Sequence, residues 1–372
     1  MEIVDVRVVP LAVPLARGFA AARDRGLADA SPHLERLLVA VEADDGLTGW
    51  GEGAPFPSWP RGLDRRAMQA IIEDEYRPLL LGRDPRRLGE LIPALEKAAD
   101  SPFALAAVDM ALWDLLGQIL QMPLYLQLGG LARPALPLHY SIGLKEPAAV
   151  AAEARAAWAQ GYTDFKLKVG GPDFAAEEAA VAAVREAVGD GARIRVDVNG
   201  AWTVSQAIDR INRLNRYRLD LVEQPVAAED LAGMAAVRRS VEVPILADES
   251  CFNAADVVRI ARLEAADAVN IKLANCGGLW NARKMAYVAE ALGLACFMGG
   301  MLELEVGASA GFQFALSQPV ITYSTGILNM FTREPLAEPA WEARGRHAYP
   351  RPGIVGIGAR LYEDKVKAFT VA

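Results

Sequence analysis

The stretch Asp-Phe-Lys-Leu-Lys-Val, residues 164–169, is a short apolar run that carries two lysines, Lys166 and Lys168. Side chains alternate between the two faces of a β-strand, so these two lysines point to the same side. Two ammonium groups side by side are costly as core packing. We therefore expect them to belong to a functional site.

Charged residues recur downstream of this stretch, and each closes an apolar run. They form a series with gaps of 29, 26, 25 and 24 residues: Lys168, Asp197, Glu223, Asp248 and Lys272. That gap is about one strand, loop and helix, which favours parallel strands with helical crossovers. In a closed barrel of this kind the functional side chains lie at the C-terminal ends of the strands. A doubly wound sheet is the alternative, but no Gly-x-Gly-x-x-Gly follows a strand.

The expected fold is α/β, a (β/α)7β barrel of the TIM type with an α+β capping domain. Residues 1–130 are predicted to form the cap, 131–326 the barrel, and 327–372 a C-terminal segment that returns to the cap. The predicted barrel strands are 138–144, 164–169, 193–198, 219–223, 245–248, 268–273 and 295–298, with a weaker candidate at 320–323. In the cap, the long loop Arg17–His33 is predicted to be either a substrate lid or a plain surface loop.

Composition excludes several classes of function. A net charge of −8 over 372 residues argues against a nucleic-acid partner. No uninterrupted apolar run is long enough to cross a bilayer, and the first residues alternate as a strand and do not resemble a signal peptide, so we expect no membrane contact and a cytoplasmic protein. Three scattered cysteines without C-x-x-C spacing indicate neither a disulfide framework nor a thiolate metal site.

The three carboxylates of the series, Asp197, Glu223 and Asp248, fall on consecutive predicted strands. They would repel one another unless a cation lay among them, and a ligand set made only of oxygen favours Mg²⁺. Each could instead cap the helix that follows it. The lysines at the matched positions before and after the three carboxylates favour the metal site.

Lys168 and Lys272 flank this metal site in strand order. A metal-bound carboxylate substrate would place its α-carbon between them, and the metal would stabilise the enediolate that forms as the α-proton leaves. A lysine can take that proton if a nearby cation and partial burial lower its pKa. Lys166 is predicted to supply positive charge beside Lys168, or alternatively to be an ion-pair partner of Asp197 or Glu223.

Several motifs together resemble the enolase superfamily, and within it the muconate-lactonizing enzyme and dipeptide epimerase branch of the mandelate racemase/muconate lactonizing enzyme family. They are Gly49-Trp-Gly-Glu-Gly, Asp109-Met-Ala-Leu-Trp-Asp, Lys166-x-Lys168, Asp197-x-Asn199, Glu223-Gln-Pro, Asp248-Glu-Ser, and Lys272 followed by Gly277-Gly278. The resemblance extends over nearly the whole chain.

This resemblance implies roles for named residues. Asp197, Glu223 and Asp248 would bind Mg²⁺, with Mn²⁺ as a substitute, and Lys168 and Lys272 would be the acid/base pair. Lys166 would assist Lys168 and contact the substrate carboxylate, while Asn199 and Glu249 would contact substrate or support the ligands. Family members are commonly homo-oligomers, so we expect one here.

The chain departs from the family at the last strand, where dipeptide epimerases often carry Asp-x-Asp and muconate cycloisomerases carry a nearby Glu. Here residues 321–326 read Ile-Thr-Tyr-Ser-Thr-Gly and contain no acid. We therefore expect racemisation or epimerisation of an N-substituted amino acid or related small acid. The alternatives are muconate-type cycloisomerisation, dehydration of an acid sugar or hydroxy acid, and a non-catalytic barrel that binds a metal-carboxylate ligand. Glu303 is the nearest acid after the seventh strand and a candidate substrate contact.

Overall fold

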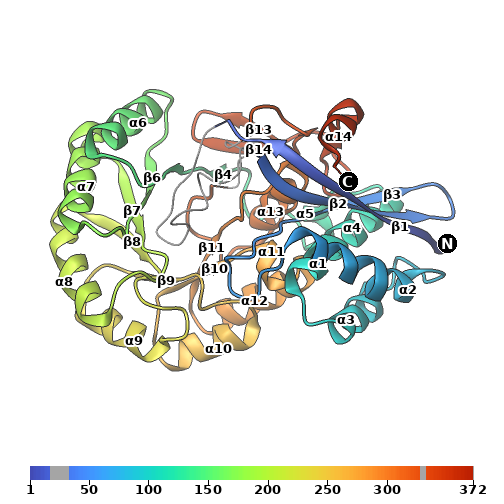
Figure 1. Cartoon of the computed structure of the whole chain (residues 1–372), viewed down its shortest axis with the longest axis horizontal. Helices are drawn as coiled ribbons and strands as arrows, with labels where there is room; N and C mark the ends of the chain where they lie inside the picture. The colour runs from blue at the N-terminus through green and yellow to red at the C-terminus, as the bar shows by residue number, and fades with distance from the viewer. Residues whose placement is uncertain (17–32, 327–331, 372) are drawn as a thin grey trace.

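The computed structural model describes residues 1–16, 33–326 and 332–371 of the chain. In Figure 1 the barrel lies on the left and the cap on the right, and both chain ends lie on the cap side. The predicted lid falls outside the described residues except for His33, which begins a strand.

The cap is built on a three-stranded antiparallel sheet. Its strands are β1 (Ile3–Pro14), β2 (His33–Ala43) and β3 (Thr48–Gly53), in the order β1-β2-β3. The sheet is followed by a run of helical elements: α1 (Arg65–Ala70), the π-helix η2 (Ile71–Tyr76), α2 (Arg77–Leu80) and α3 (Leu88–Ala98). Gly82, in the turn between α2 and α3, has a φ of +74°, a left-handed conformation that glycine adopts without strain.

Helix α4 (Pro102–Leu120) is the central helix of the cap, and the short α5 (Leu124–Gln127) follows it. The Ser101 side chain accepts a hydrogen bond from Ala104 N, and Pro102 stands in the first turn, which are common features of a helix start. Strand β3 approaches α4 so closely that a Cβ on Gly49 or Gly51 would overlap the helix backbone. By length and hydropathy α4 could cross a membrane, but 78% of its apolar window is buried, as in the core helix of a globular protein.

The barrel sheet has seven parallel strands in the order β11-β10-β9-β8-β7-β6-β5, so spatial order follows chain order. The strands are β5 (Tyr140–Ile142), β6 (Asp164–Lys168), β7 (Arg193–Asp197), β8 (Leu219–Glu223), β9 (Ile245–Ala247), β10 (Ala268–Ile271) and β11 (Ala295–Met298). The intervening helices are α6 (Pro147–Ala159), α7 (Phe174–Val188), α8 (Val204–Leu214) with the 3-10 turn η3 (Asn215–Tyr217), α9 (Leu231–Ser240), α10 (Ala254–Arg262), α11 (Leu273–Cys276), α12 (Leu279–Ala291) and α13 (Glu305–Ser317). Figure 1 shows α6 to α10 on the outside of the strands. The predicted barrel is confirmed, and the doubly wound alternative is excluded because the strand order does not reverse.

The weak strand candidate at 320–323 does not form a regular strand, but its segment joins the two edges of the sheet. Ile321 bridges to Cys296 on β11, and Thr325 bridges to Leu138 beside β5. Buried Arg195 of β7 donates hydrogen bonds to the carbonyl oxygen of Ser324 at 3.0 Å and to its Oγ at 2.7 Å. Hydrogen bonds from a side chain thus partly replace the backbone hydrogen bonds that a regular eighth strand would make between the two edges of the sheet.

The C-terminal segment pairs with both parts of the molecule. It contains β12 (Ala337–Glu338), β13 (Trp341–Arg344), β14 (His347–Pro350), β15 (Arg360–Leu361) and α14 (Glu363–Phe369). Strand β14 pairs with β4 (Leu136–Pro137), at the start of the barrel. At the other end, Thr370 bridges to Leu11 of β1, so the last described residues lie against the cap.

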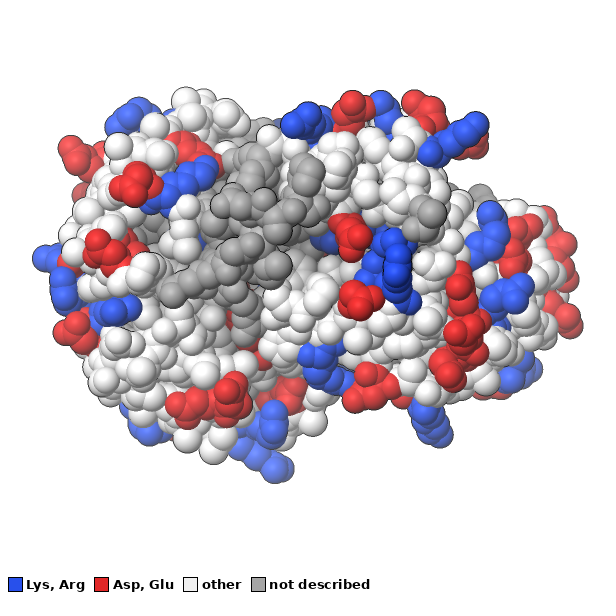
Figure 2. All heavy atoms as spheres, viewed as in Figure 1, with Lys and Arg blue, Asp and Glu red and all other residues white. Residues whose placement is uncertain are grey.

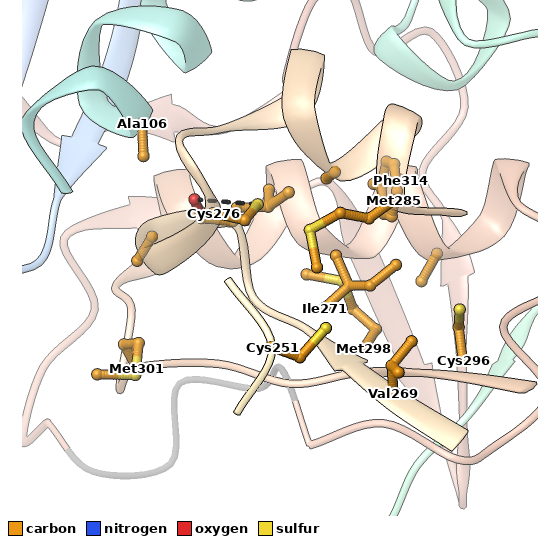
Figure 3. Close-up of a cluster of buried hydrophobic side chains, with 14 of the residues drawn as sticks. Ala106, Cys251, Val269, Ile271, Cys276, Met285, Cys296, Met298, Met301 and Phe314 are labelled. Atoms are coloured by element: carbon orange, nitrogen blue, oxygen red, sulfur yellow. Dashed lines mark hydrogen bonds between the residues drawn. The ribbon is translucent and has the colours of Figure 1, made fainter. Parts of the chain in front are cut away.

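One hydrophobic core runs from the cap into the barrel. The cysteines Cys251, Cys276 and Cys296 are buried free thiols within it (Figure 3), and burial raises the pKa of each thiol. On the face drawn in Figure 2, acidic and basic side chains are interspersed over the visible surface.

Candidate active site

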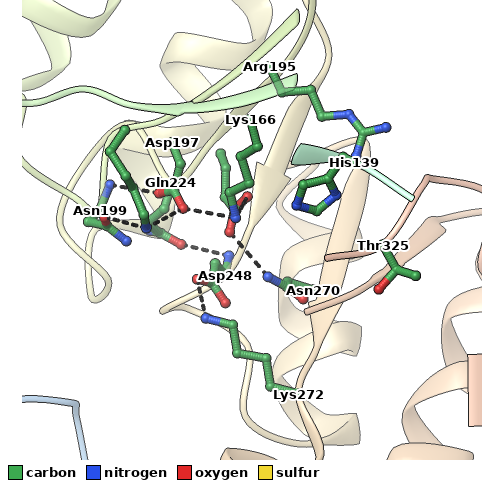
Figure 4. A network of polar contacts seen from close by, with 12 residues as sticks. His139, Lys166, Arg195, Asp197, Asn199, Gln224, Asp248, Asn270, Lys272 and Thr325 are labelled. Carbon is green, nitrogen blue, oxygen red and sulfur yellow. Dashed lines mark hydrogen bonds and ion pairs between the residues drawn. The ribbon is translucent and has the colours of Figure 1, made fainter. Parts of the chain in front are cut away.

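Sheet register brings the charged series to one end of the barrel. Lys168 is paired in register with Asp197, and Asp197 with Glu223. Asp248 follows directly after β9 and Lys272 directly after β10. Figure 4 labels four residues of the site, whose side chains lie close together: Lys166, Asp197, Asp248 and Lys272. The six predicted charged residues therefore meet in one place: Lys166, Lys168, Asp197, Glu223, Asp248 and Lys272.

The two lysines of β6 point to the same side, as predicted. Lys166 Nζ lies 2.9 Å from Asp197 Oδ2 and 2.6 Å from Glu223 Oε2. Lys168 Nζ donates to the same Asp197 oxygen at 2.7 Å and to Asn199 Oδ1 at 2.9 Å. Lys166 thus forms ion pairs with both Asp197 and Glu223, the two partners that the alternative prediction named for it.

Lys272 stands on the other side of the carboxylates. Its Nζ donates to Asp248 Oδ2 at 2.6 Å and lies 4.1 Å from the centre of the Trp59 ring. An ammonium over an indole face is attracted by the ring quadrupole. Trp59 comes from the loop after β3, so the cap contributes one wall of the site.

Amides support the carboxylates. Asn199 Nδ2 donates to Glu249 Oε1 at 2.9 Å, and Asn270 Nδ2 donates to Glu223 Oε1 at 3.2 Å. Gln224 Oε1 accepts from the backbone N–H of Asp248 at 2.9 Å, which fixes the turn after β9. Asn199 and Glu249 were predicted, whereas Asn270, Gln224 and Trp59 were not. Asn270 carried a signal, since it precedes Lys272 by two residues and so faces the same side of its strand.

Glu303 lies in the loop after β11, and its carboxylate is turned toward its own loop. Glu303 Oε2 accepts a hydrogen bond from Met301 N at 2.7 Å. Burial raises its pKa, and the charges of Arg36 and Lys272 oppose that rise. A contact between Glu303 and substrate stays a prediction.

Facing charges set the protonation of the site. Burial alone would lower the pKa of Lys166, but Asp197 and Glu223 outweigh it and the pKa is raised; Asp248 and Glu249 do the same for Lys272. Burial and the neighbouring charge of Asp197 raise the pKa of Glu223 to about 7. Lys166 and Lys272 both face carboxylates, which keep their ammonium groups charged. A lowered lysine pKa beside a bound cation stays a prediction.

The carboxylate chemistry suits a hard divalent cation. Among residues 1–16, 33–326 and 332–371, no three Asp, Glu, His or Cys side chains converge closely enough to hold a metal ion, since Lys166 lies between two of the carboxylates. However, Asp248 Oδ1 is buried and meets no hydrogen-bond partner within the described part of the chain. A buried oxygen of that kind, beside two further buried carboxylates, fits a ligand set for Mg²⁺.

Comparison with known proteins identifies the family. Residues 28–129 match the N-terminal domain of the mandelate racemase/muconate lactonizing enzyme family, and residues 149–365 match the enolase C-terminal domain-like family. The chain belongs to the mandelate racemase/muconate lactonizing enzyme family of the enolase superfamily. It is accordingly an enzyme of this family.

Three similar proteins represent two reaction classes. Muconate cycloisomerase 1 of Rhodococcus opacus is 34% identical over 375 residues, which cover 100% of this chain and 99% of that protein. The N-succinyl-L-Arg/Lys racemase of Bacillus cereus is 33% identical over 344 residues, 90% of each chain, and its crystal structure has a TM-score of 0.94. A dipeptide epimerase of Enterococcus faecalis, in a crystal structure with Mg and the dipeptide L-Leu-L-Tyr, has a TM-score of 0.90, 31% identity, and coverage of 97% of this chain and 100% of that one.

Proposed function

We propose that this enzyme racemises or epimerises an N-substituted α-amino acid, or a related small acid, by moving the α-proton of a carboxylate substrate. One observation carries the proposal: in strand order Lys168 comes before, and Lys272 after, three strands that end at buried carboxylates, and each lysine is bonded to one of these carboxylates. Two bases facing one α-carbon are what inversion requires, because one removes a proton and the other returns it on the opposite face.

A divalent cation completes the proposal, with Asp197, Glu223 and Asp248 as its ligands and Mg²⁺ as the ion, or Mn²⁺ in its place. When bound, the ion would stabilise the negative charge that develops on the substrate carboxylate as the α-proton leaves. Lys166 would add positive charge beside Lys168 and contact that carboxylate. Asn199 and Asn270 would hold Glu249 and Glu223 in place.

The substrate class is inferred from the segment that closes the barrel. Ser324 Oγ donates to Asp164 at 2.9 Å, and Thr325 Oγ1 donates to Met298 O at 2.8 Å, so both hydroxyls are engaged within the protein. Behind them, His139 is buried and its pKa is held well below the usual range by burial and by the charge of Arg195. A free α-ammonium would find no carboxylate on this segment to pair with. An N-acyl substrate, which carries no charge on nitrogen, is the better match.

The test is α-proton exchange in D₂O. Pairs of L and D enantiomers of N-succinyl and N-acetyl amino acids, together with dipeptides, are incubated with the protein and Mg²⁺ and followed by NMR and chiral chromatography. We expect deuteration at the α-carbon with inversion. Lys168→Ala and Lys272→Ala should each abolish exchange of one enantiomer and not the other. If no acid exchanges in either configuration, the racemase proposal is wrong.

Cycloisomerisation is the second candidate, because a full-length relative of equal identity is a muconate cycloisomerase. The same experiment separates the two functions when cis,cis-muconate is included. Lactone formation without exchange or inversion of any amino-acid derivative would favour the cycloisomerase.

A further inference from the structure

The turn that carries Lys272 is held at both ends. We call residues Lys272–Trp280 the hook: strand β10 ends, α11 makes one turn, two glycines follow, and α12 begins. The carbonyl oxygen of Lys272 accepts from Cys276 N at 3.1 Å, and that of Leu273 accepts from Gly278 N at 2.9 Å. The hook is therefore compact, and a shift at its far end is transmitted to Lys272.

The far end of the hook is bound by the cap. Asp109, a fully buried residue of α4, accepts hydrogen bonds from Leu279 N and from Trp280 N, the latter at 3.3 Å. These are the first N–H groups of α12, which have no partner within their own helix, and the two carboxyl oxygens of Asp109 accept from them. The cap thus supplies the N-terminal partner for a helix of the barrel.

The two glycines of the hook are explained by this contact. Gly277 and Gly278 have φ values of +90° and +92°, which favour glycine. A Cβ on Gly278 would overlap the Asp109 carboxylate, and a Cβ on Gly277 would stand 3.2 Å from Leu105, one helical turn before Asp109. Helix α4 therefore lies directly against the hook.

The near end of the hook meets the cap at Trp59, whose ring faces the Lys272 ammonium at 4.1 Å. The other proposed base is remote from this contact. Lys168 stands on β6, four strands from β10 in the sheet, where Asp197 and Asn199 of the barrel bond it. The contact between α4 and the hook is thus close to Lys272 and not to Lys168.

We propose that Asp109 is a positioning residue for Lys272: by holding the start of α12 it fixes the hook and so the place of the Lys272 ammonium between Asp248 and Trp59. Its catalytic consequence rests on the proposed function. Proton transfer on the Lys272 face depends on the cap through Asp109, and proton transfer on the Lys168 face does not.

The test compares two buried carboxylates of the same helix. Asp109→Asn keeps the size of the side chain but replaces one acceptor oxygen with an NH2 group. That NH2 group would face a backbone N–H of α12, and two donors cannot bond each other. Asp114→Asn is the matched control, since Asp114 is also buried but accepts from Trp50 N at 2.8 Å and Ile357 N at 2.7 Å, outside the hook. For each variant the exchange rates of both enantiomers are measured, with Lys168→Ala and Lys272→Ala assigning the faces.

We expect Asp109→Asn to slow exchange on the Lys272 face by about 10- to 100-fold, the cost of misplacing a reacting group by about 1 Å, with the Lys168 face much less affected. Asp114→Asn should leave the ratio of the two faces unchanged. Equal losses on both faces in Asp109→Asn would overturn the proposal, because a general weakening of the fold has no preferred face. If Asp109→Asn does not fold, Asp109→Ser, which keeps one acceptor oxygen, replaces it.

A second readout needs no substrate. Lysine acetylation by acetic anhydride, followed by mass spectrometry, gives the reactivity of Lys272 relative to Lys168, and hydrogen–deuterium exchange gives the protection of residues 273–280. Asp109→Asn should raise Lys272 reactivity and lower that protection, whereas Asp114→Asn should do neither. Wild-type protein that exchanges no substrate contradicts the proposed function alone. Unchanged labelling and protection in Asp109→Asn contradict the positioning role alone.

Discussion

Lys166 Nζ lies 2.6 Å from Glu223 Oε2, in an ion pair whose side chains are 12% and 3% exposed. The same ammonium also bonds Asp197, so one positive charge is shared by two carboxylates at the end of the barrel. Those carboxylates are two of the three proposed metal ligands. A divalent cation and Lys166 therefore compete for the same oxygens, and the charge of each can replace that of the other.

Lys166→Met is expected to destabilise the protein, because it leaves Asp197 and Glu223 buried with less compensating charge. Breaking a buried pair from one side costs about 3 to 5 kcal/mol. Saturating Mg²⁺ should recover more of the unfolding free energy in the variant than in the wild type, since a ligand of the folded state stabilises it. Urea denaturation with and without Mg²⁺ measures both quantities. Lys284→Met, at a lysine whose side chain is 47% exposed, is the control. A variant as stable as the wild type without Mg²⁺ would contradict this account of Lys166.

Asp197→Asn is expected to abolish measurable Mg²⁺ binding in calorimetry. Asp197 is 1% exposed, and its pKa is lowered because the charges of Lys166 and Lys168 overcome the effect of burial, so it presents a charged oxygen at neutral pH. The amide keeps the shape but removes the charge that a hard cation requires. Asp209→Asn, on the surface of α8, should bind as the wild type does. Unchanged affinity in Asp197→Asn would remove Asp197 from the proposed ligands.

The stability that depends on Asp109 should fall as the pH rises. Burial raises the pKa of Asp109 from the ordinary Asp value to about 8. Between about pH 4 and 8 the folded protein therefore holds a proton there that the unfolded chain has released. The stability contributed by this bound proton is fully present below the pKa of Asp109 in the unfolded chain. It is lost as the pH rises through the pKa of Asp109 in the folded protein.

Wild type should accordingly lose stability relative to Asp109→Asn between pH 5 and 8, by up to about 1.4 kcal/mol per pH unit. Urea denaturation at each pH gives this difference. The stability difference between wild type and Asp114→Asn should stop changing at a lower pH, because burial raises the pKa of Asp114 only to about 6. Parallel curves for wild type and Asp109→Asn would show that this carboxyl does not titrate in that range.

The barrel and its charged site could be predicted because spatial order follows chain order in this sheet. A repeat of 24 to 29 residues between Lys168 and Lys272 was enough to place each charge on its own strand. Strand alternation then put Lys166 beside Lys168. Each of these inferences uses local spacing alone.

Contacts between the cap and the barrel could not be predicted in the same way. Two such contacts are the Trp59 ring over Lys272 and the Asp109 side chain at the start of α12. Both join residues far apart in the chain, and the spacing of residues along the sequence does not show how the cap packs on the barrel. The pKa shifts of Lys166 and Lys272 could not be predicted either, because they depend on which charges each ammonium faces, and distances between strands decide that.

Residues 320–326, which join the two edges of the barrel sheet, are held partly by hydrogen bonds from the Arg195 side chain. Arg195 and Arg193 stand on the same strand, and both pair with Asp164 Oδ1, at 3.4 and 3.0 Å. Their burial differs sharply, with side-chain exposures of 2% and 49%. Only Arg195 of the two donates to Ser324 in the described structure.

Arg195→Met should therefore destabilise the protein by about 3 to 5 kcal/mol, since it takes the buried cation away from Asp164, which keeps only the half-exposed Arg193, and removes the donor to both Ser324 oxygens. Arg193→Met removes an ion pair to the same Asp164 oxygen from an arginine that is itself 49% exposed, and it should cost no more than about 1 kcal/mol. Urea denaturation compares the two variants directly. Hydrogen–deuterium exchange should rise in residues 320–326 for Arg195→Met and stay unchanged for Arg193→Met. Equal losses in both variants would show that the pair with Asp164, and not the bonds to Ser324, holds the barrel closed.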